Sequence, residues 1–391
     1  MTHTDIVQLE ERYQLKTYRK KPIAAVRGEG CWIWDAADKR YLDLYGGHCV
    51  TLLGHNHPGV TAALKAQLDE LLFYSNAVYS PVRARAVEAL ATMAPVGMRN
   101  VFFCSTGTEA NETALKLARK TTGRTEMLAM EGGFHGRTIG SLSVTHGKYR
   151  EPYKDVMGPT TFVPFGDARA ALAALRTGTY AGLIIEPMQS MAGMAESTAG
   201  YFRLLREACT DAGTALIFDE IQTGVGRTGT FSISERYGML PDLITMAKSL
   251  GNGVPVGAVL VSDAISGTVN YGDQGTTFGG GMLAMAAVEA TLAAVRDEDI
   301  MEKARRIEVT IRHRLGPKIK EIRGGGCLLG LDLGFPVAPV VTALLQDGII
   351  VGGSDHPNVM RVMPPAVTPL EEIEKFTDVL ESCMREAPRV A

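Results

Sequence analysis

The chain has 391 residues, of which 46% are hydrophobic and 21% charged, the proportions of a globular protein that can bury a large core. Its formal net charge of −3, from 40 basic and 43 acidic residues, argues against a nucleic-acid-binding surface and against a polyanionic tail. Glycine is the outlier, because its 43 residues exceed the usual level of about 7%.

Strand-like and helical segments alternate along most of the chain, after a predicted strand pair at Ile23–Arg27 and Cys31–Asp35. The predicted helices are Pro58–Phe73, Pro81–Ala94, Thr108–Lys120, Ala168–Leu175, Gly200–Ala212, Ser232–Tyr237 and Met282–Arg296. The predicted strands are Val101–Cys104, Glu126–Met130, Thr161–Pro164, Gly182–Glu186, Ala215–Asp219, Leu243–Met246 and Val256–Val261. This alternation predicts an α/β fold whose mostly parallel sheet has helices on both faces.

The pattern changes after about residue 297, where a smaller α+β unit is predicted. A charged helix at Ile300–Leu315 is followed by strands at Gly326–Leu333, near Ile349–Val351 and at Met360–Val362, and by a final helix. We therefore expect a large domain over residues 46–296 and a small C-terminal domain over 297–391. Residues 1–45 are expected to pack with the small domain.

Signals for targeting and metal binding are weak. Residues 1–21 are polar and mixed in charge, unlike a signal peptide, and no apolar run reaches about 18 residues. The six cysteines form no C-x-x-C pair, which disfavours a zinc site and a redox dithiol. We expect a cytoplasmic protein with reduced cysteines, no metal and no membrane or nucleic-acid partner.

Gly224–Gly229 fits the G-x-G-x-x-G pattern of dinucleotide-binding proteins and follows the predicted strand Ala215–Asp219. The five residues from Asp219 to Thr223 make the turn before the glycines too long for that motif. No long helix opens at Gly229, and no acidic residue ends a strand about 20 positions later. A nicotinamide-binding site is therefore disfavoured.

The segment Ser105–Glu112 lies between an apolar strand and a good helix. Small residues at a helix N-terminus leave backbone N–H groups free at the positive end of the helix dipole, which suits a phosphate. The alternative is an ordinary helix start capped by Ser105 or Thr106. Taken alone, the segment does not decide between the two.

Lys248 lies at the end of an apolar strand and just before the turn Gly251–Gly253. Functional groups of α/β proteins gather outside the carboxyl ends of strands. A partly desolvated lysine there favours its neutral amine form, which imine chemistry requires. The alternative is a surface lysine that extends from the strand end, and taken alone Lys248 favours that interpretation.

Taken together, these features indicate a single cofactor site. Asp219 at one strand end, Lys248 at the next and a phosphate-suited helix start at Thr106–Thr108 are the parts that hold pyridoxal phosphate. The lysine forms the Schiff base, and the aspartate keeps the pyridine nitrogen protonated so that the ring accepts electrons. The helix start holds the phosphate.

At these residues the chain closely resembles the class III aminotransferases of pyridoxal phosphate fold type I, from about Tyr41 to Pro365. Within that class it looks most like the acetylornithine and ornithine group. The motifs that carry the resemblance are Leu42–Gly47, Gly54–Pro58, Ser105–Asn111, Phe134–Thr138, Glu186–Gln189, Phe218–Gly229, Lys248 and Pro255–Ala258.

The resemblance implies roles for the cofactor site. Lys248 would bind the cofactor covalently and shuttle the proton at the substrate Cα, and Asp219 would pair with the pyridine nitrogen. Gln222 would bond the ring's phenolic oxygen and Phe134 would stack on the ring. The remaining implied cofactor contacts are His135, in the Phe134–Thr138 motif, and Thr106, Gly107 and Thr108 around the phosphate.

The resemblance also implies partners and substrate contacts. Thr277 resembles the threonine that reaches the phosphate of the neighbouring subunit, so an obligate homodimer is expected. Arg137 resembles the arginine that clamps a substrate carboxylate, and Arg361 the one that binds the α-carboxylate of 2-oxoglutarate or glutamate. The alternative for both arginines is a buried ion pair.

Three departures from the family pattern stand out. Met191 replaces the glutamate that pairs with the second arginine in ornithine and 4-aminobutyrate enzymes, which leaves the partner of Arg361 and the acceptor open. Gly279–Met282 differs from the usual Gly-Gly-Asn-Pro. His48 occupies a position that faces substrate in relatives, although a buried histidine bonded to backbone is the favoured interpretation.

The implied reaction is ping-pong transfer of an amino group. The donor expected is the terminal amine of an ornithine-like or acylated diamino acid, and the acceptor is 2-oxoglutarate. Alternatives are a 4-aminobutyrate or amine:pyruvate transaminase, an aminomutase, and a nonenzymatic regulator, which the intact Lys248, Asp219 and Gln222 disfavour.

The glycine excess has a location. Thirteen glycines lie between Gly224 and Gly281, in the stretch that carries Lys248 and Thr277. We interpret this as backbone that approaches a cofactor and a subunit contact closely. A branched residue at Gly251 or Gly279 is therefore expected to cost cofactor occupancy before it costs folding.

Overall fold

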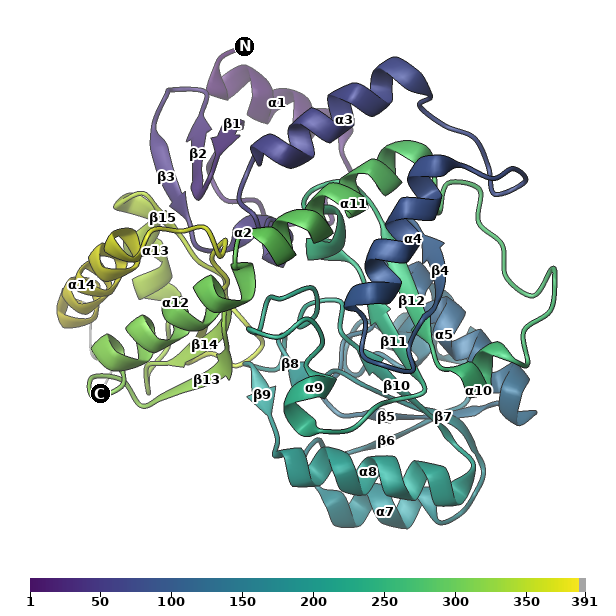
Figure 1. Ribbon diagram of the computed structural model, residues 1–391. Coiled ribbons are helices and arrows are strands. Elements are labelled where there is room, and N and C mark those ends of the chain that lie inside the picture. The colour runs from purple at the N-terminus through teal and green to yellow at the C-terminus, as the bar shows by residue number, and fades with distance from the viewer. Residues whose placement is uncertain (387–391) are drawn as a thin grey trace.

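The computed structural model describes residues 1–386. A seven-stranded sheet forms its centre, in the order β4-β12-β11-β10-β7-β5-β6 (Figure 1). The strands are β4 (Asn100–Cys104), β5 (Glu126–Met130), β6 (Thr160–Val163), β7 (Tyr180–Ile185), β10 (Ala215–Asp219), β11 (Leu243–Met246) and β12 (Gly257–Val261). Only β12 runs antiparallel to its two neighbours. The predicted mostly parallel sheet is confirmed, and six strands end at the same edge.

Alternating side chains of the central strands enter two separate cores. In β7, Leu183 and Ile185 belong to one hydrophobic cluster and Ile184, between them, belongs to the other. The first is the larger, and it includes Leu216 of β10. Since successive strand residues point to opposite faces, this division confirms that helices cover both faces.

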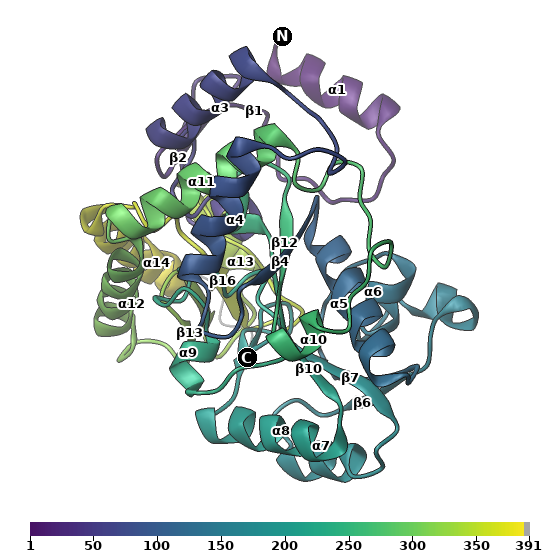
Figure 2. The same ribbon diagram turned by 45° about the vertical axis from the view of Figure 1, so that its right-hand side comes forward.

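The helix α5 (Gly107–Thr122) forms the core of the smaller cluster, and its sequence explains its limits. Thr106 and Glu109 form a reciprocal capping box at its start, and Gly123, at φ +70°, ends it in the left-handed conformation. In Figure 2, α5 lies on the side of the sheet away from α4.

The other helices of the central part are short to medium in length. They are α3 (Pro58–Glu70), α4 (Pro81–Met93), α6 (Ile139–Ser143), α7 (Ala168–Leu175), α8 (Ala199–Ala212), α9 (Ser234–Tyr237), α10 (Asp263–Ser266) and α11 (Met282–Asp297). Two 3₁₀ turns, η1 (Glu151–Val156) and η2 (Lys248–Gly251), and a small hairpin, β8 (Met188–Gln189) with β9 (Ala195–Glu196), complete it. The helices α7 and α8 lie side by side in both views (Figures 1 and 2).

The two ends of the chain share a four-stranded sheet, in the order β1-β2-β3-β15. Its strands are β1 (Ala25–Glu29), β2 (Trp32–Asp35), β3 (Arg40–Asp43) and β15 (Ile349–Ile350). The remaining N-terminal elements are α1 (His3–Tyr13), which buries no residue, and the short turn α2 (Gly46–Cys49). Pairing of β3 with β15 brings residues 1–45 to the C-terminal part, although the domain limits stay a prediction.

The C-terminal part contains a second sheet, in the order β13-β14-β16. Its elements are α12 (Ile300–Leu315), β13 (Glu321–Gly325), β14 (Leu328–Asp332), α13 (Ala338–Gln346), β16 (Val359–Val362) and α14 (Leu370–Glu386). The predicted strand Gly326–Leu333 corresponds to β14, whereas β13, which pairs with β14 across the turn after Gly325, was not predicted. Residues 387–391 of the predicted small domain lie outside the described residues.

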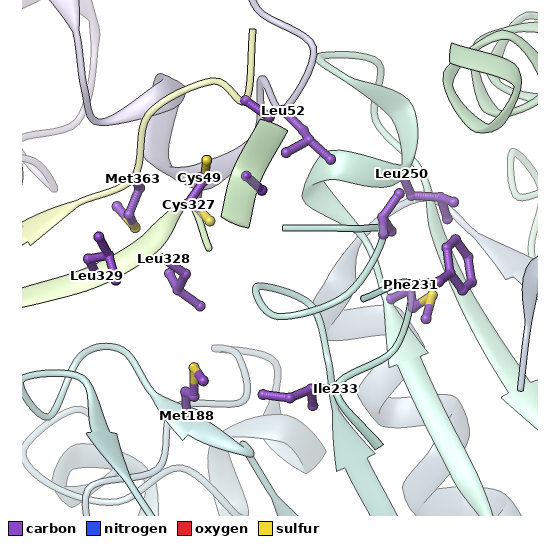
Figure 3. Close-up of a cluster of buried hydrophobic side chains, with 14 of the residues drawn as sticks. Cys49, Leu52, Met188, Phe231, Ile233, Leu250, Cys327, Leu328, Leu329 and Met363 are labelled. Carbon is purple, nitrogen blue, oxygen red and sulfur yellow. The ribbon is translucent and has the colours of Figure 1, made fainter. Parts of the chain in front are cut away.

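One continuous core joins the central and C-terminal parts. Figure 3 shows buried side chains from three regions of the chain meeting there. Cys49 and Leu52 come from the segment after β3, Phe231 and Leu250 from the central part, and Leu328 from β14. Within residues 1–386, no helix is long and apolar enough to cross a membrane.

Candidate active site

A cavity of about 410 Å³ opens at the carboxyl edge of the central sheet. Such edges position functional groups because parallel strands end there together. Eight residues predicted for the cofactor site line this cavity: Thr106, Gly107, Thr108, Phe134, His135, Asp219, Gln222 and Lys248. His48, Arg137, Thr277 and Arg361 are not among its lining residues.

Lys248 follows β11 and begins the turn η2. It adopts φ +43°, which is unusual for a residue with a side chain and is typical of functional positions. The pKa of Lys248 is lowered, chiefly because burial disfavours the charged ammonium, while the negative charges of Asp219 and Glu186 oppose that shift. The neutral amine that imine chemistry needs is therefore favoured.

Asp219 is held by a network that the sequence did not predict. Its Oδ2 accepts hydrogen bonds from His135 Nδ1 at 2.7 Å and from Asn111 Nδ2 at 2.8 Å. Asn111 is fully buried and its Oδ1 in turn accepts from Thr245 Oγ1 at 2.8 Å. The three neighbours fix the carboxylate in one orientation without an arginine or lysine pair.

The start of α5 divides its backbone groups between a cap and the cavity. Thr106 belongs to the cap, because its hydroxyl accepts from Glu109 N and its own N–H donates to Glu109 Oε2. This matches the capping alternative for Thr106 and withdraws its N–H from phosphate binding. Gly107 and Thr108 line the cavity, and their N–H groups bond no acceptor within residues 1–386.

Two further contacts shape the cavity walls. Glu186 Oε1 accepts from the backbone N–H of Phe134 at 2.7 Å, and burial raises the pKa of Glu186 to about 7, with His135 opposing the shift. Gln222 Oε1 is buried and has no hydrogen-bond partner among the described residues. An unsatisfied buried acceptor is costly, so Gln222 is prepared for a donor supplied from outside the chain.

Comparison with known proteins decides the family. The model of the aminotransferase class-III family matches residues 13–384 of the chain. The chain belongs to the class-III aminotransferases. It is 40% identical over 386 residues to the acetylornithine aminotransferase of Methanopyrus kandleri, covering 97% of this chain and 99% of that one. The acetylornithine aminotransferase of Methanosarcina mazei is 38% identical over 385 residues, covering 97% and 96%.

Solved structures agree with the sequence comparison. The ornithine aminotransferase of Toxoplasma gondii ME49 superposes with a TM-score of 0.91 at 30% identity, covering 98% of this chain and 96% of that one. The acetylornithine aminotransferase of Elizabethkingia anophelis has a TM-score of 0.88 at 28% identity, covering 99% and 100%. The protein is a transaminase of fold type I, and its cofactor is pyridoxal 5′-phosphate.

The class-III site is built to fit this cofactor. The cavity joins a lysine with a lowered pKa, an oriented carboxylate, an unpartnered amide oxygen and free helix N–H groups. Gly107 keeps the phosphate end open, since a Cβ there would lie 2.7 Å from Ile221 Cδ1. No cluster of three His, Cys, Asp or Glu side chains able to hold a metal occurs in the described part of the chain.

The two candidate arginines of the transaminase differ in environment. Arg137 is exposed, and its Cζ lies 4.2 Å from the ring centroid of Tyr149 and 6.0 Å from that of Phe134. Arg361, in β16, is only 3% exposed. Neither forms an ion pair with a carboxylate of residues 1–386, so the buried ion-pair alternative is wrong for both.

Two predicted residues lie at the surface of the single chain. His48 is exposed, and its Nδ1 lies 2.5 Å from Tyr45 Oη, so the expectation of a buried histidine bonded to backbone was wrong. Thr277 is exposed on the segment between α10 and α11 and does not line the cavity of its own subunit. Its predicted reach into a neighbouring subunit stays a prediction.

Proposed function

We propose that this transaminase moves the terminal amino group of an ornithine-like or acylated diamino acid to 2-oxoglutarate by a ping-pong mechanism. The names of its relatives, acetylornithine and ornithine aminotransferases, support this donor class. The observation that carries the proposal is the buried cation Arg361, which no carboxylate of residues 1–386 pairs with and which hydrogen-bonds only neutral oxygens of those residues. A carboxylate-bearing substrate satisfies the cation and presents its reacting carbon to the lysine.

In this proposal Lys248 binds the cofactor covalently and, once free, removes and returns the proton on the substrate carbon that carries the transferred amino group. Asp219 accepts a hydrogen bond from the pyridine nitrogen, with His135 and Asn111 holding the carboxylate in position. Gly107 and Thr108 bind the phosphate, Phe134 covers the ring, and the side-chain amide of Gln222 hydrogen-bonds the phenolic oxygen of the ring. When bound, pyridoxal phosphate would supply the electron sink that makes removal of this proton possible.

The proposed assembly is an obligate homodimer. Arg137 at the surface binds the distal carboxylate of the donor, and the partner's copy of Thr277 completes the phosphate site. Exposed apolar side chains on the segments near Thr277 support a subunit contact, since Phe278 is 66% exposed and Tyr79 is fully exposed in the single chain.

A donor screen tests the proposal. Candidate donors are added one at a time to the cofactor-loaded enzyme, and loss of the visible absorbance of the lysine-bound cofactor is followed. We expect N-acetylornithine or a similar ω-amino donor to bleach the band, and 2-oxoglutarate to restore it. Rapid bleaching by simple amines alone, with recovery by pyruvate, would instead identify an amine:pyruvate transaminase. Lys248→Ala is expected to lose turnover by at least about 10⁴-fold.

A further inference from the structure

Arg361 is a buried cation surrounded by neutral groups. Its Nε donates to the carbonyl of Gly353 at 2.6 Å, its Nη1 to Ser190 Oγ at 3.1 Å and its Nη2 to Tyr45 Oη at 3.2 Å. A guanidinium has five N–H donors, so these bonds fix its plane and leave two donors for another acceptor. No internal carboxylate within residues 1–386 offsets its charge.

The hydroxyl of Tyr45 links Arg361 to His48. Tyr45 Oη accepts from Arg361 Nη2 and lies 2.5 Å from His48 Nδ1. Because the single hydroxyl proton cannot serve Arg361, which has no acceptor, it is directed to the histidine. His48 Nδ1 is therefore the acceptor. Although part of its side chain is exposed in the single chain, desolvation by the surrounding atoms and the charges of Lys248 and Arg361 lower its pKa to about 4.

His48 lies in a segment whose backbone conformation is strained. Gly46, Gly47, His48 and Cys49 all have φ between +56° and +71°, which is one turn of left-handed helix. Left-handed conformations cost residues with a side chain about 1–2 kcal/mol each. Two such residues in succession, next to the cofactor lysine, indicate that this strain is maintained for the site.

We propose that Tyr45, His48 and Ser190 are positioning residues that hold Arg361 through neutral oxygens, so that its full charge stays available to a substrate carboxylate in both halves of the reaction. The inference rests on the proposed transaminase function and narrows its substrates. Both the amino-group donor and the acceptor can place a carboxylate on Arg361 without displacing an internal acid. The ligands favoured on Arg361 are therefore the 2-oxo acid acceptor and the α-amino acid formed from it, in which that carboxylate is adjacent to the reacting carbon.

Binding of glutarate, an unreactive dicarboxylate, tests the arrangement without turnover. Calorimetry on the cofactor-loaded enzyme is expected to show Kd raised about tenfold in Tyr45→Phe, which frees Arg361 Nη2 and loosens the guanidinium. Ser190→Asp, which adds an acid in contact with Nη1, is expected to raise Kd by a larger factor because the new carboxylate competes with the ligand. Tyr41→Phe is the matched control, since Tyr41 Oη bonds only Asp35, outside the site.

A pair of variants at His48 separates positioning from strain. His48→Gly relieves the left-handed backbone but removes the acceptor, whereas His48→Asn retains an acceptor at the position of Nδ1 and tolerates positive φ. We expect His48→Gly to raise the KM for 2-oxoglutarate about tenfold with a smaller change in kcat, and His48→Asn to remain near the wild-type value. Equal KM values in the two variants would overturn the role of His48.

The outcomes distinguish the inference from the function on which it rests. If the wild-type enzyme transfers no amino group, the proposed function fails whatever the glutarate affinities are. If transfer occurs but glutarate binds Tyr45→Phe and Ser190→Asp as tightly as wild type, the positioning proposal is wrong. Retention of cofactor and of the thermal unfolding midpoint in both variants shows that the affinities report on Arg361 and not on damage to the fold.

Discussion

Two adjacent carboxyl groups, Asp219 and Glu220, meet different surroundings. Asp219 faces the cavity and is held by His135 and Asn111. Glu220 is fully buried on the other side of the strand, where Ser232 Oγ donates to it at 2.5 Å and the N–H of Ile233 at 2.8 Å. Burial raises the pKa of Glu220 to about 7, because these neutral donors do not replace water.

This shift predicts a pH-dependent effect of Glu220→Gln. Folded Glu220 keeps a proton up to about pH 7 that the unfolded chain releases near pH 4.5, so its contribution to stability is present below pH 4.5 and is lost as the pH rises through 7. Glutamine stays neutral, with its amide able to donate to Ser232. We expect the variant to gain stability relative to wild type between these pH values, by up to about 3 kcal/mol. Thermal unfolding from pH 4.5 to 8, at one protein concentration, measures the difference; a constant difference contradicts the assignment.

At the scale of residues, the sequence predicted side chains that follow strand ends and missed those that support them. Lys248 and Asp219 were found because each ends an apolar strand, and the comparisons confirm the family to which that pattern belongs. Asn111 and Tyr45 were missed as supporting residues because their partners are remote in sequence, at Asp219 and Arg361. A side-chain contact across 316 residues leaves no local pattern to find.

At the scale of elements, β12 connects the two ends of the cofactor site. It pairs with β11, which leads to Lys248, and with β4, which leads to the start of α5. Gly279, on the segment before α11, lies against the end of β4, where an added Cβ would be 2.6 Å from Cys104 Cα and 2.5 Å from Phe103 O. Both of these atoms belong to the backbone, so they cannot rotate away from the added Cβ as a side chain could.

Gly279→Val is therefore expected to shift the end of β4 and the adjoining phosphate site. Overpacking of this kind costs about 1–3 kcal/mol, and if cofactor binding bears this cost, cofactor affinity falls by about 5- to 150-fold. Gly275→Val is the matched control on the same segment, because a Cβ at Gly275 meets nothing within 4 Å. Cofactor absorbance per subunit after dialysis measures retention. Equal cofactor retention in the two variants would mean that the excess glycines serve only turns.

Some helices and strands could be predicted from sequence patterns, and others could not. Helices with a clear start, such as α4 after Ser80-Pro81, and strands such as β10 were predicted within a few residues. The strand β3 was missed because it is short and its parallel partner β15 is distant in the chain. The strand β13 was missed because its five residues, Glu321–Gly325, include two charged residues and two glycines and show no apolar pattern. The helix α1 was missed although Thr2 and Asp5 form a capping box, because its later residues bury nothing and show no apolar face.

At the scale of the whole molecule, the proposed homodimer makes a prediction about mixed subunits. Lys248→Ala removes the cofactor lysine, and Thr277→Asp places a negative charge where the partner's phosphate is proposed to bind. A hybrid dimer would combine an intact Lys248 from one chain with an intact Thr277 from the other. Random re-association should thus restore about a quarter of wild-type activity from two inactive proteins, since half of the dimers would each have one good site.

Activity after denaturation and joint refolding of the two variants measures this recovery. Each variant refolded alone, and the two refolded separately and then combined without exchange, are the controls. No recovery despite demonstrated hybrid dimers would contradict the placement of Thr277 in the neighbouring site. In that case Thr277 would serve its own subunit or have no role in the phosphate site.

The shared sheet β1-β2-β3-β15 has a consequence for synthesis of the chain. Strand β3 leaves the ribosome about 300 residues before β15, its parallel neighbour, which at roughly 5–20 residues per second is a delay of about 15–60 s. During that interval the edge of β3 has no partner and can pair with other chains. The first 45 residues thus complete their fold last, and a nascent chain that stalls before β15 exposes this edge to aggregation or to a chaperone.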